Sequence, residues 1–330
     1  MASPVLFFVS TGFHTYTLNA LILSACGGQG VRVQPVRYDE LFGQAAFAPG
    51  CYIFADIERL SVHERRLAAS LFRAMAERRD RFLPLNDPAR VRFRYALLRA
   101  LFEAGVNGFD AYRANGLPRP ARFPVFLKAE AEHGPALTDL LGDQAALDAA
   151  LVRLQDSGEP LEGLAVIEFA AEPVAPGLWT RFTAFGVAGT IVPDLPVTET
   201  HWMVKTGARG LVDEAGYASH DRMIREGRYL GVLARAFQLA GIGFGRADFG
   251  LVGGRPQIYE INTNPVLSGL EPPHPSATRQ ATRTLAWQRL TQALAALARQ
   301  APRGEDVPLD LPLIAAHVAR SGHAPMGWRP

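Results

Sequence analysis

The segment 246–265 constrains this chain more than any other, because its pattern predicts a β-hairpin with one polar face. In a strand, alternate side chains point to the same side of the sheet. Apolar residues occupy every second position of both predicted strands, so the polar residues between them share a side. These polar residues are Arg246 and Asp248 in the first strand and Glu260 and Asn262 in the second.

The length of the turn decides whether the two polar faces coincide. A two-residue turn at 253–254 would set Asp248 across from Tyr259, with the two carboxylates on opposite faces. A three-residue loop at 253–255 would set Asp248 opposite Glu260. We expect the longer loop, which brings two carboxylates and an amide oxygen together. Hard oxygen ligands of this kind suit magnesium, which also holds nucleotide phosphates.

The hairpin resembles the C-terminal signature of the ATP-grasp superfamily, an R-x-D strand followed about a dozen residues later by E-[IV]-N-x-x-P. Residues 246–248 (RAD) and 260–265 (EINTNP) match both halves. Members include D-alanine-D-alanine ligase, glutathione synthetase and the ribosomal-protein glutamate ligases. The resemblance implies two magnesium ions, with manganese as a substitute. Asp248 and Glu260 would hold one ion, and Glu260 and Asn262 the other.

Lysine is rare in this chain: only Lys128 and Lys205 occur among 34 basic residues, and the rest are arginines. A compact ammonium is not equivalent to a planar guanidinium, so retained lysines are candidates for tight charged sites. Segment 123–128 (FPVFLK) resembles the family strand that ends in a phosphate-binding lysine. Lys205 falls where relatives have a later basic residue at the phosphates. The family's glycine-rich lid is reduced to a trace at 133–134, and its closure over the phosphates is left open.

Segment 164–172 resembles the strand and hinge against which adenine stacks in the family. The resemblance implies that Glu168, Phe169 and Ala170 meet the base, largely through backbone groups. It also makes Glu172 a candidate for the ribose hydroxyls.

Two arginines extend the implied site. Arg181 lies on a strand that reaches the substrate side of the phosphates in relatives. Arg94, or Arg92, would replace a lysine that many relatives carry before the central subdomain, and we take Arg94 as the nucleotide contact. Arg181 and Asn264 are the implied substrate contacts. The implied catalytic residues are Arg246, Lys205 and Arg181.

The order of strand-like and helix-like patterns predicts an α/β (α+β) chain. A doubly wound α/β domain at 1–85 precedes a two-subdomain ATP-grasp fold. The central or lid subdomain is expected at 86–172, the C-terminal subdomain at 173–300, and a proline-containing tail at 301–330. A capping box at 61–64 should open the first clear helix. The expected helices are about 62–79, 88–104, 144–155, 221–240 and 278–299, with hairpins at 179–192 and 246–262.

Composition narrows the class of partner. A net charge of +2, with both signs interleaved, argues against nucleic acid and membrane surfaces and favours small-molecule or peptide substrates. No run approaches the roughly 20 apolar residues of a membrane span. Segment 23–26 resembles a lipoprotein processing site, but the first basic residue is Arg32 and 10–17 is largely polar, so a secretory leader is not expected. Cys26 and Cys51 are too few for a disulfide framework, which fits the cytoplasm.

The implied activity is that of an ATP-dependent, magnesium-requiring ligase. A substrate carboxylate would attack the γ-phosphate, and an amine or similar nucleophile would capture the acyl phosphate. The substrates would be an amino acid, a peptide or a small metabolite, and a homo-oligomer is compatible with the family. Neither His133 nor His201 receives a role. Two alternatives are a small-molecule kinase of the same fold and a non-catalytic ATP-binding module.

Overall fold

A computed structural model of the chain describes residues 3–20, 29–131, 134–267 and 273–321. The segment 23–26 with Cys26, and His133 of the lid trace, lie outside these described ranges. Cys51 is a buried thiol. Within the described part of the chain, no helix is both long and apolar enough to cross a membrane.

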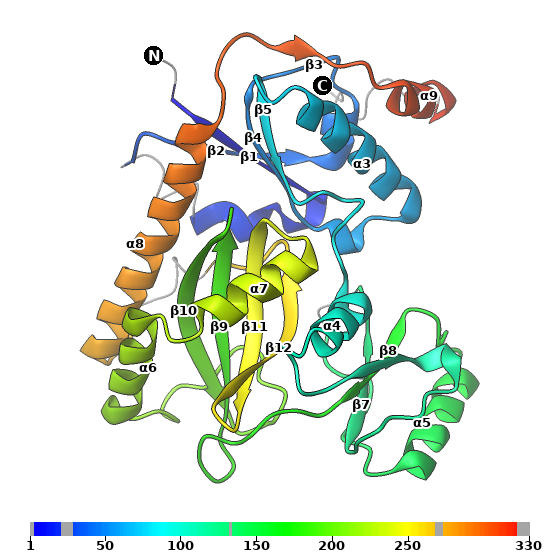
Figure 1. The fold of residues 1–330 in the computed structure, drawn as a ribbon, viewed down its shortest axis with the longest axis vertical. Coiled ribbons are helices and arrows are strands. Elements are labelled where there is room, and N and C mark those ends of the chain that lie inside the picture. The colour runs from blue at the N-terminus through cyan, green and yellow to red at the C-terminus, as the bar shows by residue number, and fades with distance from the viewer. Residues whose placement is uncertain (1–2, 21–28, 132–133, 268–272, 322–330) are drawn as a thin grey trace.

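The N-terminal part is built on a four-stranded parallel sheet, drawn at the top of Figure 1. Helix α3 (Val62–Glu77) covers one face, and Ser61 caps it as expected: the Ser61 hydroxyl accepts from the amide of Glu64, whose carboxylate accepts from the amide of Ser61. The helix ends two residues before the predicted position. In sheet order, the strands are β2 (Arg32–Arg37), β1 (Val5–Ser10), β4 (Gly50–Phe54) and β5 (Phe82–Leu85).

Residues after 300 return to this N-terminal part. Strand β13 (Val307–Pro308) pairs antiparallel with β3 (Ala46–Phe47), and helix α9 (Pro312–Ser321) packs beside α3. Leu311 and Ile314 are buried in the same hydrophobic cluster as the residues of α3. The short elements of the N-terminal part are η1 (Gly12–Leu18), α2 (Tyr38–Phe42) and η3 (Ile57–Arg59).

A smaller three-stranded sheet forms the central subdomain, at the lower right of Figure 1. Its strands run in the order β6 (Ala111–Arg113), β8 (Leu164–Glu168) and β7 (Val125–Ala129), and helix α5 (Gln144–Asp156) packs against them. A short η4 turn (Ala114–Gly116) follows β6. The predicted strands and the predicted helix of this region are confirmed.

The C-terminal sheet is antiparallel, in the order β10 (Thr190–Glu199), β9 (Trp179–Val187), β11 (Phe244–Val252) and β12 (Arg255–Asn262). Both predicted hairpins are confirmed. One face buries residues such as Ala247, Phe249 and Ile258 against helices α4 (Arg94–Glu103) and α7 (Leu230–Ala240).

The opposite face of this sheet is apolar at one end and polar at the other. At the apolar end, Phe185 and Phe244 share a core with the N-terminal sheet and with the long helix α8 (Ala277–Gln300). Figure 1 shows α8 running beside both sheets. The polar end carries Asp248 and Glu260, and it opens toward the central subdomain.

Two helix predictions are wrong. The single helix expected at 221–240 is two helices, α6 (Glu214–Glu226) and α7, separated at Gly227, whose φ of +63° belongs to the left-handed region. The helix expected from residue 88 begins only at Arg94. The Asp87 carboxylate instead accepts from the amide of Ala89 in a local turn, and the next residues run against the end of α7.

Candidate functional site

The β11–β12 hairpin aligns its polar residues as predicted, but by a different route. Asp248 pairs with Glu260 and Arg246 with Asn262, so all four share one face. The three-residue loop is wrong, since the tip is a two-residue turn at 253–254. Both glycines have positive φ, +56° and +74°, as a type I′ hairpin turn requires.

A β-bulge at Tyr259 compensates for the shorter turn. Phe249 pairs with Ile258 while Asp248 pairs with Glu260, which leaves Tyr259 as the extra residue. Its hydroxyl donates to the carbonyl of Ala170, at 3.0 Å. A Cβ on Gly250 would lie 2.0 Å from the Tyr259 hydroxyl oxygen, so this strand position needs glycine. The bulge therefore both restores the carboxylate pairing and aims an aromatic ring between the two subdomains.

A cavity lies at this junction. One side is aromatic. The Phe169 ring stands perpendicular to that of Trp202, at 5.5 Å between centroids, and Phe126 lies 5.0 Å from Trp202. Such a slot suits a planar ring. Sequence reasoning assigned no role to Phe126, Trp202 or Tyr259. The complete aromatic lining is Phe109, Phe126, Phe169, Trp179, Trp202 and Tyr259.

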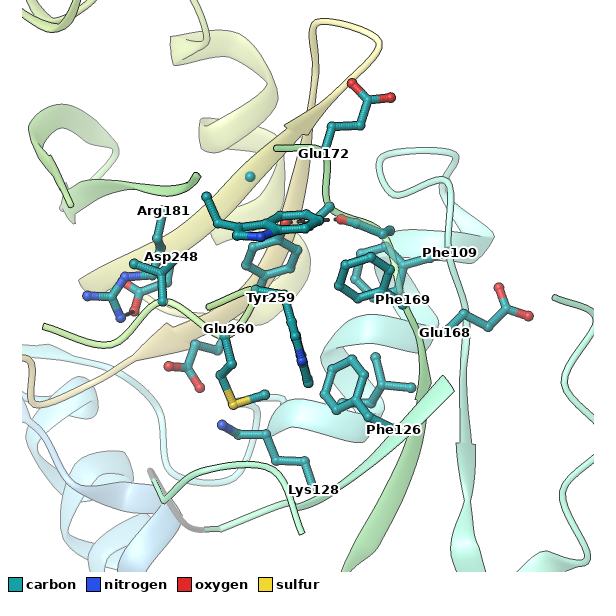
Figure 2. Close-up of a pocket in the computed structure, with 18 of the residues that line it drawn as sticks. Phe109, Phe126, Lys128, Glu168, Phe169, Glu172, Arg181, Asp248, Tyr259 and Glu260 are labelled. Atoms are coloured by element: carbon teal, nitrogen blue, oxygen red, sulfur yellow. Dashed lines mark hydrogen bonds and ion pairs between the residues drawn. The ribbon is translucent and has the colours of Figure 1, made fainter. Parts of the chain in front are cut away.

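The other side of the cavity is charged (Figure 2). Both lysines lie here, and both ammonium groups donate to the carbonyl of Gly134, Lys128 at 3.0 Å and Lys205 at 2.7 Å. Lys128 is 6% exposed. Burial, assisted by Arg94 and Lys205 and opposed by Glu260, lowers the pKa of Lys128 to about 7.

Arginines pair with both predicted acidic metal ligands. Arg94 contacts the Glu260 carboxylate at 2.6 Å. The Asp248 carboxylate lies between Arg181, at 2.8 Å, and Arg246, at 3.0 Å. The sequence suggested either Arg92 or Arg94 near the nucleotide. The structure brings Arg94 to the cavity, whereas the guanidinium of Arg92 donates to the carbonyl of Leu239 at the end of α7.

The predicted metal ligands Asp248, Glu260 and Asn262 lie together on one face of the hairpin. The amide nitrogen of Asn262 donates to the Glu260 carboxylate at 3.3 Å, and Asp248 is the cross-strand partner of Glu260. Among the described residues, no group of three or more His, Cys, Asp and Glu side chains could hold a metal ion. Magnesium commonly uses one or two carboxylates and completes its shell with phosphates and water. Two carboxylates and an amide on one face fit that mode.

The predicted hinge residues Glu168, Phe169 and Ala170 all line the cavity, but the Glu168 carboxylate points away from it (Figure 2). That carboxylate is 2% exposed and accepts hydrogen bonds from Tyr112, Arg122 and the amide of Asp110. Burial alone would raise its pKa, but these hydrogen bonds lower it. Glu168 therefore anchors the end of strand β8, and Phe169 follows directly after it.

Two other predicted contacts lie at the margin. Glu172 is exposed at the rim, where its carboxylate accepts from the amide of Gly253 at 2.9 Å. Asn264 lies outside the lining of this cavity and bonds to η1. Its amide oxygen accepts from the Thr17 hydroxyl at 2.6 Å, and its amide nitrogen donates to the carbonyl of His14 at 3.2 Å.

No protein-family model and no curated protein sequence matches this chain. Solved structures do match. The D-alanine-D-alanine ligase of Bacillus anthracis complexed with ATP is similar over 90% of this chain and 98% of its own, with a TM-score of 0.52 and 11% identity. The D-alanine-D-alanine ligase of Coxiella burnetii is similar over 98% and 97%, with a TM-score of 0.51 and 11% identity.

These likenesses, together with the sheet arrangement, show that the chain has the fold of the ATP-grasp superfamily. The expected fold class, an N-terminal α/β domain followed by the two-subdomain ATP-grasp fold, is confirmed.

Proposed function

We propose that the chain is an ATP-dependent ligase that joins a carboxylate to an amine or similar nucleophile through an acyl phosphate. The observation that carries this proposal is the meeting of Lys128 and Lys205 at one carbonyl, in a cavity whose neighbouring strands present Asp248 and Glu260. A chain that otherwise uses arginine keeps its two lysines at this place. The ATP bound to the B. anthracis ligase of the same fold supports the choice of nucleotide.

In this proposal the adenine ring enters the aromatic side of the cavity, against Phe169, Trp202 and Tyr259. Glu172 at the rim is the proposed ribose contact. The triphosphate extends toward the charged side. There, five basic side chains gather around Asp248 and Glu260, an arrangement that favours a polyanionic ligand. The basic side chains are Arg94, Lys128, Arg181, Lys205 and Arg246.

Asp248, Glu260 and Asn262 would hold magnesium, for which manganese is a chemically similar substitute. Bound magnesium supplies positive charge to the phosphate oxygens and lowers the cost of phosphoryl transfer. In the structure without nucleotide, three arginines pair with these carboxylates: Arg94, Arg181 and Arg246. When Mg-ATP is bound, these arginines would contact the phosphates instead. The protein thus keeps its buried carboxylates compensated before the nucleotide arrives.

The proposed reaction has two steps. A carboxylate oxygen of the first substrate attacks the γ-phosphorus, the bond from that phosphorus to the bridging oxygen breaks, and ADP leaves. The amine nitrogen then attacks the acyl carbon, phosphate leaves, and the nitrogen gives its proton to phosphate or water. Arg181, Lys205 and Arg246 stabilise the negative charge that builds up at the transferring group.

The test combines nucleotide binding with product analysis. Calorimetric titration of Mg-ATP into the protein should give measurable heat. Amino acids and short peptides are then screened for phosphate release, and mass spectrometry of the products should show an amide. A phosphorylated product without released phosphate would indicate a kinase instead, and nucleotide binding without turnover would indicate a binding module. Absence of heat with Mg-ATP would reject the proposal.

Such an ATP-consuming enzyme would work in the cytoplasm.

A further inference from the structure

The loop 200–207 supplies side chains to both sides of the cavity between the two ATP-grasp subdomains. It follows β10, and it carries Trp202 on the aromatic side and Lys205 on the charged side. The two ends of the loop are joined, because the amide of Ala208 donates to the carbonyl of Thr198 at 2.8 Å. A compact loop whose ends lie close together is an Ω-loop. The position of this loop therefore decides where two residues of the proposed nucleotide site lie.

Contacts with the central subdomain hold the far side of the loop. The Trp202 ring packs against the rings of Phe126 and Phe169. The sulfur of Met203 accepts from the amide of Ala136 at 3.2 Å. These contacts join the loop to β7, to the segment after β7 and to the segment after β8. The loop thus spans the junction between the two subdomains.

A single carboxylate holds the base of the loop. Glu199 is the last residue of β10, and its Oε1 accepts hydrogen bonds from three consecutive backbone amides. The donors are the amides of Lys205 at 3.1 Å, Thr206 at 2.7 Å and Gly207 at 2.7 Å. Successive amides turned toward one anion form a nest, a backbone arrangement that binds negative groups. In this loop the side chain of the preceding strand fills the nest.

The nest depends on a glycine and on the charge of the carboxylate. Gly207 has a φ of +83°, in the left-handed region, and a Cβ at this position would lie 2.9 Å from the Cβ of Val197. Burial alone would raise the pKa of Glu199, but the hydrogen bonds from the three amides lower it below its ordinary value. The carboxylate is therefore charged at pH 7, and hydrogen bonds to a charged acceptor are stronger than those to a neutral one.

Glu199 acts on Lys205 through the backbone. Lys205 donates its amide to Glu199 and its ammonium to the carbonyl of Gly134. The carbonyl of Lys205 accepts from Arg181 at 2.7 Å, and Arg181 also pairs with Asp248. Three polar groups of one residue are thus bound by three different parts of the chain. A side chain held in advance loses less conformational entropy when a ligand binds.

We propose that Glu199 is a positioning residue for the nucleotide cavity: its carboxylate holds the loop 200–207 so that Trp202 faces the base and Lys205 faces the phosphates. This inference rests on the proposed function and goes beyond it, since Glu199 is not among the described residues that line the cavity. When the charge of Glu199 is removed, the loop is no longer held at the junction. The contact with the base and the contact with the phosphates are then weakened together.

The chain contains only two lysines, Lys128 and Lys205, so acetylation reports on the loop in the absence of nucleotide. The variant Glu199→Gln keeps the size of the side chain and removes its charge. Variant and unmodified protein are treated briefly with acetic anhydride at pH 8, and mass spectrometry gives the rate at each lysine. We expect Lys205 to react about threefold faster or more in the variant, because weaker hydrogen bonds no longer hold the loop closed. An unchanged rate at Lys205 would overturn the inference.

Two partial ligands test both side chains that the loop carries. In the proposed site adenosine contacts the aromatic side and tripolyphosphate the charged side, and both are titrated calorimetrically alongside Mg-ATP. In Glu199→Gln we expect each partial ligand to bind about threefold or more weaker and Mg-ATP about tenfold or more weaker, since the loss of charge weakens the hydrogen bonds that hold the loop. Weaker binding of one partial ligand alone, or of neither, would contradict the shared positioning.

Two further variants separate positioning from loss of stability. Gly207→Ala distorts the nest from the backbone side and should reproduce both effects, so it replaces Glu199→Gln if that variant does not fold. Asp143→Asn is the matched control. The exposed Asp143 carboxylate also accepts from a backbone amide, that of Ala146 at 2.8 Å, but it caps α5 outside the cavity.

The control should leave the acetylation rate of Lys205 and the affinity for Mg-ATP within about twofold of the unmodified protein, since distant sites act independently. A lower unfolding temperature in Glu199→Gln, with unchanged acetylation and affinity, would show that Glu199 only stabilises the fold, and it would overturn the inference.

The Mg-ATP titration separates this inference from the proposed function. Faster acetylation of Lys205 in Glu199→Gln, when the unmodified protein gives no heat with Mg-ATP, would reject the ligase proposal and support the role of Glu199 in holding the loop. Heat from Mg-ATP with the same affinity in both proteins would reject the role of Glu199 alone.

Discussion

Lys128 and Lys205 donate to the same backbone oxygen, the carbonyl of Gly134, from β7 and from the segment after β10. Two ammonium groups this close repel each other, and the fold holds them together next to the Glu260 carboxylate. Proximity of like charges is unfavourable unless an anion joins them. The arrangement is that of a site whose ligand is negatively charged, and it leads to a prediction about pH.

ATP affinity should fall as pH rises from 7 to 9. In the unliganded protein the pKa of Lys128 is about 7, below its usual 10.5, so the side chain is largely neutral at pH 8. A bound triphosphate raises that pKa, and ATP binding at pH 8 therefore takes up a proton. The dissociation constant of ATP should therefore rise by up to about tenfold per pH unit, the limit set by uptake of one proton. Calorimetry in two buffers of different ionisation enthalpy measures the uptake, and Lys128→Met should abolish it. No uptake by the unmodified protein at pH 8 would contradict the prediction.

The lowered pKa of Lys128 also makes the folding stability of the protein depend on pH. Between pH 7 and 10.5 the unfolded chain binds more protons at Lys128 than the folded chain does. By linkage, this group makes the unliganded protein more stable as pH rises through that window, and below the window its contribution no longer changes with pH. Thermal unfolding of the unmodified protein and of Lys128→Met, compared at pH 7 and pH 9, measures the difference.

Lys128→Arg should weaken Mg-ATP binding by about tenfold or more. A guanidinium is larger than an ammonium, and the pocket is already flanked by Arg94 and Lys205. Calorimetric titration with Mg-ATP checks the expectation. Arg153→Lys, on the exposed side of α5, exchanges the same two residue types away from the site and should have no effect. An unchanged affinity in Lys128→Arg would show that this position does not need a compact cation.

Glu260→Gln should lower ATP turnover by about a hundredfold or more, because it removes the charge of a proposed metal ligand while keeping the size of the side chain. Glu260 is the better test of the metal site, since its side chain is 17% exposed. Turnover and thermal unfolding are measured together. Glu77→Gln, at an exposed position of α3, is the control. If a folded Glu260→Gln variant turns over ATP about as fast as the unmodified protein, Glu260 is not a metal ligand.

Asp248→Asn should lower stability as well as turnover. Asp248 is 1% exposed and lies between Arg181 and Arg246, so loss of its charge leaves buried cations uncompensated. Breaking a buried ion pair costs about 3–5 kcal/mol. Chemical denaturation of the variant measures this cost. A stability equal to that of the unmodified protein would show that the two arginines find other partners.

Gly250→Ala should destabilise the protein by about 1–3 kcal/mol, because the new methyl group would overlap the Tyr259 hydroxyl. It should also weaken nucleotide binding, since Tyr259 lines the cavity. Gly231→Ala provides the matched control. It makes the same change in helix α7, where nothing lies within 4 Å of the added carbon, and should stabilise the protein slightly. Equal unfolding temperatures for the two variants would argue against the close contact.

Local patterns predicted most of the elements and failed where tertiary contacts compete with them. The capping box at Ser61 correctly predicted the start of helix α3, because both residues that form it lie within one turn of helix. The Asp87-Pro88 signal was misleading because the local turn that it opens stops at Val91, and the amide of Arg92 donates to the carbonyl of Ala240 at the end of α7. At Gly227, one glycine in the left-handed region divides an otherwise continuous helical pattern.

The sequence by itself determined that one hairpin carries Asp248 and Glu260 among apolar neighbours, and that lysine survives at only two positions. Strand periodicity and residue chemistry are local properties, so they can be read without coordinates. Only the tertiary structure decided that a bulge at Tyr259 aligns the carboxylates, that arginines pair with them, and that the Glu199 carboxylate holds the loop that carries Lys205. These features depend on contacts between residues far apart in the chain, whose geometry is set by the packing of the sheets and helices and not by any local pattern.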